Sequence, residues 1–169
     1  THTAFNVVSV VTTTGYASDD YSQWGPFAAM AFFYLTFVGG CSGSTSGGMK
    51  IFRFQVAIKM LLSQLRFLIH THGVFVSRYN GAPLSDEISR GVVAFSFFFF
   101  LTIAGLALAL AMLGLDLVTA LTGAATAVAN VGPGLGDIIG PAGNFSTLPD
   151  AAKWLLCVGM LMGRLEILT

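Results

Sequence analysis

The chain has 169 residues, of which 54% are hydrophobic and only 9% are charged, whereas soluble domains carry about 25% charged residues. Its mean hydropathy of +0.77 therefore predicts an integral membrane protein. Eight basic and eight acidic side chains cancel, which argues against a nucleic-acid partner. The cysteines and histidines lack the spacing of ligands, so we expect neither a disulfide framework nor a metal-binding cluster.

The first predicted element is a short apolar half-helix over residues 4–11, which ends in the sequence TTTGY at residues 12–16. A helix that crosses a bilayer needs about 20 apolar residues, so this segment is expected to enter the membrane and turn back. A polar, acidic stretch over residues 17–24 follows. Pro26 then opens an apolar helix over residues 27–38, because proline suits the first turn of a helix.

Ten residues rich in glycine and serine follow this helix. They resemble a nucleotide-binding loop, but Met49-Lys50-Ile51 replaces the Lys-Ser/Thr pair that such a loop requires. Glycines at every fourth position also fit a helix-packing face. Because so many glycines disfavour a continuous helix, we prefer a helix break that forms a gating loop. The candidate gate residues are Gly39, Gly40, Cys41, Ser42, Gly43, Ser44, Thr45, Ser46, Gly47 and Gly48.

The middle of the chain alternates helical and turn signals. Residues 49–68 have the pattern of an amphipathic helix, with basic side chains between apolar ones. In the polar connector over residues 71–85, Asn80-Gly81 is a hairpin signal and Ser85 is a helix-capping residue. An apolar helix over residues 91–115 is then long enough to span the membrane.

A second half-helix over residues 117–129 is again too short to cross, and it ends in Asn130-Val131-Gly132-Pro133. A polar stretch leads to a last apolar segment over residues 151–169, in which Arg164 lies about 20 Å from the start of the helix. Charge at that depth is costly and usually faces protein or water. Glu166 is two positions away and does not share its helix face, so we assign Arg164 a functional role as a donor to loop carbonyls.

An internal repeat emerges from this order: half-helix, glycine loop, polar stretch, proline and helix occur twice. Pro26 matches Pro149 at an offset of 123 residues, and Gly15 matches Gly132 at 117. The first copy lacks an opening helix, and two such units cannot close a ring, so we expect a piece of a longer protein. Six of the eight basic residues lie within residues 49–90, which the positive-inside rule places on the cytoplasmic side, with both glycine loops open to the outside.

The glycine loops suit monovalent cations. Backbone carbonyls can replace the water around such an ion without adding fixed charge, and glycine permits the unusual backbone angles that this requires. Each half-helix directs its negative end toward the loop. The alternatives are ordinary turns, a carrier that alternates access to a small solute, and a membrane scaffold without transport. An enzyme has no support, because no nucleophile–base pair or phosphate-binding loop is present.

TTTGY, GGCSGSTSGGMK, NVGPGLG and MGRLEILT, in this order, resemble the Trk-type potassium uptake membrane subunit of the Trk/Ktr/HKT superfamily. The resemblance implies an all-α integral membrane fold of four helix–pore loop–helix repeats, one helix being interrupted. It also implies potassium uptake through a carbonyl-lined filter, with Arg164 as a pore arginine against the gating loop. The implied filter residues are Thr13, Thr14, Gly15, Tyr16, Asn130, Val131, Gly132 and Pro133, with potassium held at Thr14, Gly15, Val131 and Gly132.

The same resemblance assigns residues 1–70 to the third repeat from its pore loop onward, 71–85 to a cytoplasmic connector and 86–169 to the fourth repeat. It implies a multi-pass protein of the cell inner membrane, surrounded by lipid bilayer and joined to its own N-terminal repeats. A homodimer and a cytosolic nucleotide-binding regulatory subunit are the implied partners. No cofactor is expected beyond the transported potassium ion.

Overall fold

The computed structural model describes residues 1–70, 78–79 and 82–165, where the regular structure is helical apart from one pair of short strands, as the sequence predicts. The six helices are α1 (His2–Val11), α2 (Pro26–Phe37), α3 (Ile51–Ile69), α4 (Asp86–Met112), α5 (Leu117–Ala129) and α6 (Asp150–Arg164). Two short 3-10 helices, η1 (Tyr21–Trp24) and η2 (Phe145–Thr147), lie in the polar stretches. Strands β1 (Arg78–Tyr79) and β2 (Ala82–Pro83) pair antiparallel; the predicted turn between them, at residues 80–81, lies outside the described residues.

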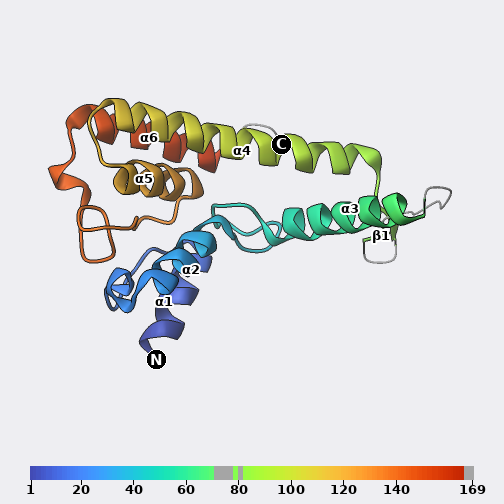
Figure 1. Cartoon of the computed structure of the whole chain (residues 1–169), viewed down its shortest axis with the longest axis horizontal. Helices are drawn as coiled ribbons and strands as arrows, with labels where there is room; N and C mark the ends of the chain where they lie inside the picture. Colours follow the sequence, from blue (N-terminus) through green and yellow to red (C-terminus); the bar gives the residue numbers. More distant parts are fainter. Residues whose placement is uncertain (71–77, 80–81, 166–169) are drawn as a thin grey trace.

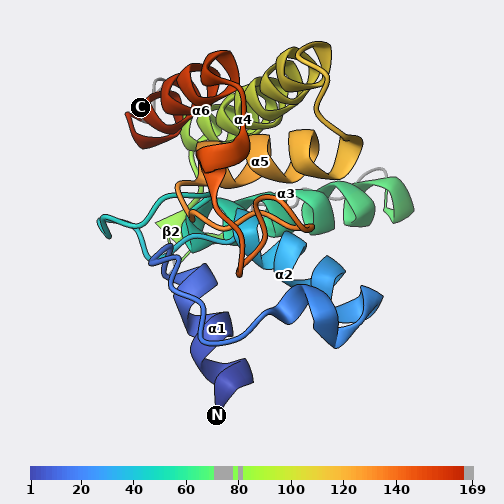
Figure 2. The ribbon, with the colours of Figure 1, turned by 90° about the vertical axis from the view of Figure 1, so that its left-hand side faces the viewer.

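The helices form layers that two perpendicular views show in the same order (Figures 1 and 2). Helices α4 and α6 lie side by side in one layer, α5 packs against both, and α1 and α2 lie beyond α5. Helix α3 extends away from this group and contacts α4. The two half-helices, α1 and α5, therefore come close to the same region from different layers.

Helix α4 has the length and composition of a membrane span. It has 27 residues, and it is the only helix among the described residues that is long and apolar enough to cross a bilayer by itself. The Ser85 side chain caps it by accepting a hydrogen bond from the Ile88 N–H at 3.3 Å, which confirms the predicted start signal. Large apolar side chains such as Phe97 and Leu108 remain exposed along it, as expected for a surface that meets lipid or further helices.

The predicted helix break is confirmed. Helix α2 ends at Phe37 and α3 begins at Ile51, and the two ends of the segment between them pair side by side, Val38 with Met49. The Met49 N–H donates to the Phe37 carbonyl and the Gly39 N–H to the Met49 carbonyl, both at 2.9 Å. These bonds close the ends of the glycine-rich segment into a loop, so the alternative of a continuous helix with a glycine packing face is wrong.

Small side chains allow α5 to lie at the centre of the molecule. Ala124, Ala125, Ala127 and Ala129 are fully buried, because α4 and α6 both cover this helix. Gly163 of α6 lies so near α5 that a Cβ there would overlap the Val128 carbonyl. This close approach brings the end of α6 to the end of α5.

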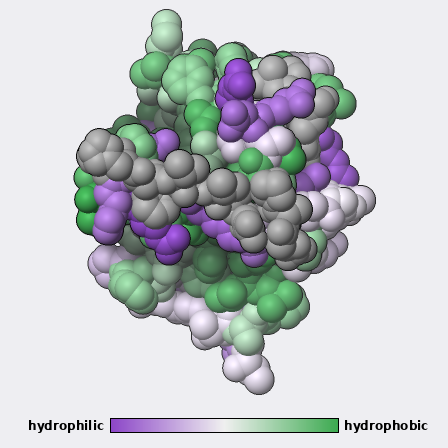
Figure 3. Space-filling model, turned by 90° about the vertical axis from the view of Figure 1, so that its right-hand side faces the viewer, coloured by the Kyte–Doolittle hydropathy of each residue, from purple (hydrophilic) through white to green (hydrophobic). Residues whose placement is uncertain are grey.

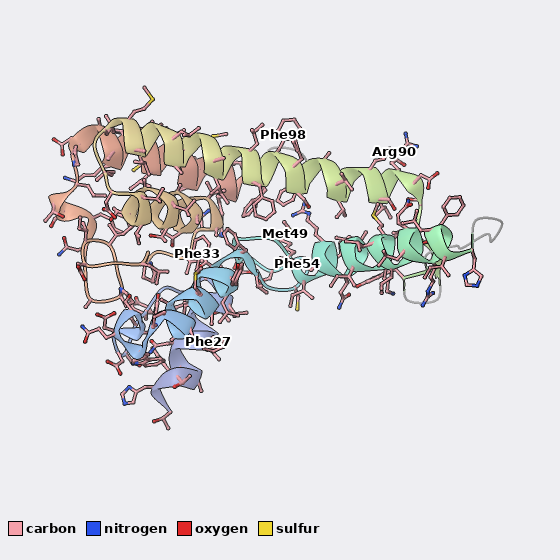
Figure 4. The ribbon with its side chains drawn as sticks, viewed as in Figure 1. Phe27, Phe33, Met49, Phe54, Arg90 and Phe98 are labelled. Atoms are coloured by element: carbon pink, nitrogen blue, oxygen red, sulfur yellow. The ribbon has the colours of Figure 1, made fainter. Side chains whose placement is uncertain are left out.

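The far end of the molecule, where α3 ends and α4 begins, carries hydrophilic residues beside hydrophobic ones (Figure 3). Arg90 lies there on α4 (Figure 4). Nearer the centre, the Arg53 guanidinium lies over the Phe95 ring, 3.6 Å from its centroid, and is mostly buried. The sequence predicts Arg53 only as one of several charges along an amphipathic helix, so this stacked position is a finding of the structure.

Candidate ion filter and gating loop

The two glycine loops have the same backbone course. Each half-helix is followed by a residue with left-handed backbone: Thr13 with φ 56°, two positions after the end of α1, and Asn130 with φ 55°, directly after the end of α5. Two residues later each loop carries a glycine with positive φ, Gly15 at 79° and Gly132 at 115°. Residues with a Cβ atom rarely adopt such backbone angles, which explains why glycine occupies both positions.

Matching hydrogen bonds hold the two turns. The N–H groups of Thr13 and Asn130 donate to the carbonyls of Val10 and Ala127, at 3.0 and 3.1 Å. The N–H groups of Thr14 and Val131 donate to the carbonyls of Ser9 and Thr126, at 2.9 and 3.1 Å. Each pair is separated by the same 117 residues as the loop glycines. The sequence repeat is therefore also a repeat of local structure.

The loops meet each other. A Cβ on Gly15 would overlap the carbonyl oxygen of Val131 and would lie 3.3 Å from the Pro133 ring. Gly132 faces the Cα of Gly15. The structure thus brings Gly15 of the first loop together with Val131, Gly132 and Pro133 of the second, whereas the Tyr16 side chain is 74% exposed in this chain.

Polar side chains of the half-helices support the loops from behind, and sequence reasoning missed them. The Thr126 hydroxyl oxygen accepts a hydrogen bond from the Gly132 N–H at 2.9 Å. The Thr122 hydroxyl oxygen accepts one from the Leu135 N–H at 3.1 Å. The buried Asn6 side chain does the same for the Ser18 N–H at 3.0 Å. The four-residue spacing of Thr122 and Thr126 on one helix face was the available signal.

The glycine-rich loop lies against the ends of both half-helices. The Gly47 N–H donates to the Thr13 hydroxyl at 3.1 Å, and a Cβ on Gly47 would overlap the Ala129 carbonyl. Within the loop, the Gly40 N–H donates to the Ser46 hydroxyl at 2.8 Å. One glycine thus touches both repeats at the base of the two glycine loops, whereas Cys41 in the glycine-rich loop is exposed.

Arg164 reaches the glycine-rich loop from α6. Its guanidinium donates to the Thr45 carbonyl, a contact between residues 119 positions apart. The two also line a cavity of about 360 Å³, together with Lys50 and Gly163. The structure therefore places Arg164 at the loop, as the sequence led us to expect, on the side of the loop where α6 ends. The predicted neighbour Glu166 lies outside the described residues.

Two titratable groups in the outer segments have shifted pKa values. Burial, with the Asp20 carboxylate nearby, raises the pKa of Tyr21 to about 12; its ring stacks on Phe32 with centroids 4.0 Å apart. Hydrogen bonds from Thr119 lower the pKa of Asp116, which caps the start of α5. Both groups hold connecting segments, and neither lies at the filter loops.

Paired half-helices with touching loops, a broken helix beneath them and one long apolar span define a helical membrane protein built from helix–pore loop–helix repeats. The chain belongs to the TrkH family, described as cation transport protein, whose family model matches residues 1–169. This confirms the resemblance inferred from the four motifs.

Several named proteins are similar to this chain. The Trk system potassium uptake protein TrkI of Halomonas elongata is 81% identical over 169 residues, covering 100% of this chain and 34% of the relative. The protein TrkG of Escherichia coli, also named a Trk system potassium uptake protein, is 33% identical over 166 residues, 98% of this chain and 34% of its own length. The crystal structure of the potassium transporter TrkH from Vibrio parahaemolyticus superimposes with a TM-score of 0.90 at 34% identity, over 98% of this chain and 35% of that one. The chain therefore spans about a third of the length of these relatives.

Proposed function

We propose that the protein to which this chain belongs takes up potassium ions across the inner membrane through a filter lined by backbone carbonyls. The observation that carries the proposal is the meeting of two pore loops with the same hydrogen bonds and the same glycine positions. The carbonyls of Thr14, Gly15, Val131 and Gly132 would replace the water of a potassium ion. Relatives similar to this chain in sequence are named potassium uptake proteins.

The remaining assignments belong to the same proposal. Residues 1–70 form the third repeat from its pore loop onward, 71–85 the cytoplasmic connector and 86–169 the fourth repeat; the N-terminal repeats complete the ring. Residues 49–90 face the cytoplasm and the filter loops face outward, since the basic residues cluster in that range. A homodimer and a cytosolic nucleotide-binding regulatory subunit complete the assembly.

Control of ion flow is assigned to the loop of residues 39–48. It lies against the bases of both pore loops through Gly47, so in this position it would stand in the path of an ion that leaves the filter. Arg164 holds it through the Thr45 carbonyl. Arg164 thereby keeps the loop in this position, and loss of this charge-assisted hydrogen bond would release the loop.

The test uses the full-length protein in proteoliposomes, with uptake of rubidium as a potassium substitute and of sodium. Wild-type protein should prefer rubidium, and Gly15→Ser should weaken this preference, because a side chain there overlaps the Val131 carbonyl. Unchanged preference in Gly15→Ser protein would remove the filter assignment.

The broken helix between α2 and α3 is also compatible with a carrier that alternates access. Single-channel currents decide between the two mechanisms, since a carrier cycle is too slow to produce them. Resolved unitary potassium currents would support the filter, and uptake that saturates without such currents would support the carrier.

A further inference from the structure

The half-helices present buried polar side chains to their own loops, and the proposed function does not use them. Thr126, Thr122 and Asn6 are at most 6% exposed. In soluble and membrane proteins alike, a buried polar group needs a hydrogen-bond partner, and each of these three finds one in the N–H of a loop residue. The bonds therefore connect the rigid half-helix to the loop that follows it.

The direction of these bonds matters for an ion. In a trans peptide the N–H and the carbonyl of one peptide plane point in opposite directions. Because the Gly132 N–H is tied back to the Thr126 hydroxyl at 2.9 Å, the Val131 carbonyl of the same peptide points away from α5. The Val131 carbonyl points toward Gly15 of the other loop, where the two filter loops meet.

A second bond of this kind occurs in both repeats. Ser18 and Leu135 are separated by the same 117 residues as the loop glycines, and both donate their N–H to a half-helix side chain. The acceptors come from non-equivalent positions, since the residue 117 positions after Asn6 is Gly123. The two repeats therefore share a hydrogen bond from an equivalent loop N–H to a half-helix side chain, although the accepting residues, Asn6 and Thr122, are not equivalent.

We propose that Thr126, Thr122 and Asn6 are positioning residues that set ion selectivity by fixing the backbone of the filter loops from behind. The proposal rests on the proposed function. Carbonyls held at a fixed separation cannot close around a smaller ion, whereas a loop released from its half-helix can. Loss of these hydrogen bonds would therefore increase sodium uptake more than potassium uptake.

The experiment compares isosteric and hydroxyl-keeping variants of the full-length protein. Thr126→Val removes the acceptor and keeps the volume, and Thr126→Ser keeps the acceptor. Thr122→Val and Thr122→Ser form a second pair. Thr102→Val is the matched control, because the Thr102 hydroxyl bonds only its own helix α4, at the Phe98 carbonyl. Gly15→Ser serves as the test of the filter itself.

The readouts are the ratio of rubidium to sodium uptake, the amount of protein in the membrane and the thermal unfolding midpoint. We expect Thr126→Val to lower the ratio about fivefold, the size of one net hydrogen bond, and Thr122→Val to lower it less. The serine variants should restore it at equal protein amount, and Thr102→Val should leave it unchanged. A structural role alone would change the unfolding midpoint without changing the ratio.

Unchanged ratios in both valine variants, while Gly15→Ser lowers the ratio, would overturn the positioning role and keep the filter. An unchanged ratio in Gly15→Ser would overturn the filter assignment and the positioning role with it. If both valine variants fail to accumulate while both serine variants do, the hydroxyls serve folding and the proposal is wrong.

Discussion

The two pore loops share a backbone but differ in sequence and in surroundings. Both place a left-handed residue two positions before a glycine and tie the same amides to their half-helix. After the glycine, however, one loop continues with Tyr16 and the other with Pro133. The comparison teaches that a shared loop geometry can be specified by a few positions, the glycine and the helix end, while the rest of the loop varies.

The glycines themselves differ in how tightly they are enclosed. A Cβ at Gly15 would overlap the Val131 carbonyl, whereas the nearest atom to a Cβ at Gly132 is the Gly15 Cα at 3.8 Å. The same substitution should therefore have unequal effects in the two loops. This difference gives the largest expected effect.

Gly15→Ser should lower the rubidium-to-sodium uptake ratio of the full-length protein by about tenfold or more, because it adds a steric overlap to a strained backbone angle. Gly132→Ser has the strained angle alone and should lower the ratio by less. Parallel uptake measurements in proteoliposomes check the order. An equal or larger effect of Gly132→Ser would contradict the closer packing assigned to Gly15.

The proposed gating loop contacts both repeats: the Gly47 N–H donates to the Thr13 hydroxyl, and the Arg164 guanidinium donates to the Thr45 carbonyl. Arg164→Ala removes a hydrogen bond to a charged group, and we expect the rate of potassium uptake to rise about tenfold. Gly47→Ala, whose new methyl group overlaps the Ala129 carbonyl, should displace the loop and raise it as well. Thr102→Val on α4, outside the glycine-rich loop, is the control.

Uptake that stays at the wild-type rate in both variants, at equal protein amount, would show that the loop does not limit ion flow. A higher uptake rate in Arg164→Ala alone would support the role of Arg164 in holding the loop and would remove the role of Gly47. The two substitutions therefore separate the hydrogen bond of Arg164 from the close packing of Gly47 against Ala129.

The smallest expected effect concerns the starts of the half-helices. The Asp116 carboxylate caps α5 by accepting from the Thr119 N–H at 3.1 Å, whereas the Thr1 side chain makes no such bond at the start of α1. Asp116→Ala should lower the unfolding free energy by about 1 kcal/mol or less.

The stabilisation by Asp116 depends on pH, because folding lowers the pKa of this carboxyl group. A carboxyl group whose pKa falls on folding stabilises the fold above its unfolded pKa, near 4, and loses that contribution as the pH drops through the folded value. Thermal unfolding of wild-type and Asp116→Ala protein should therefore differ at neutral pH and converge in acid. A constant difference across that range would contradict the capping role of the charge.

Much of this architecture could be predicted from the sequence because it depends on local signals. Hydrophobic length separates the half-helices from the span α4, Ser85 marks the start of that span, and glycine density marks the break after α2. The predicted end of the second half-helix, Ala129, agrees with the structure. Each of these features depends only on residues that lie close together in the sequence.

The supporting bonds behind the loops could not be predicted in the same way. The residues that hold Ser18 and Leu135 lie at non-equivalent positions, Asn6 and Thr122, so the sequence repeat does not align them. Which side chain reaches a given N–H depends on how the loop folds back, and that requires coordinates. The stacked position of Arg53 over Phe95 likewise depends on the packing of α3 against α4.

The central claim, that both loops line one ion path, is tested most directly by anomalous scattering from crystals of the full-length protein grown in rubidium. Our account predicts anomalous peaks between the two loops, next to the carbonyls of Thr14, Gly15, Val131 and Gly132, which disappear when rubidium is replaced by sodium. Peaks elsewhere in the protein, with none between these carbonyls, would contradict it.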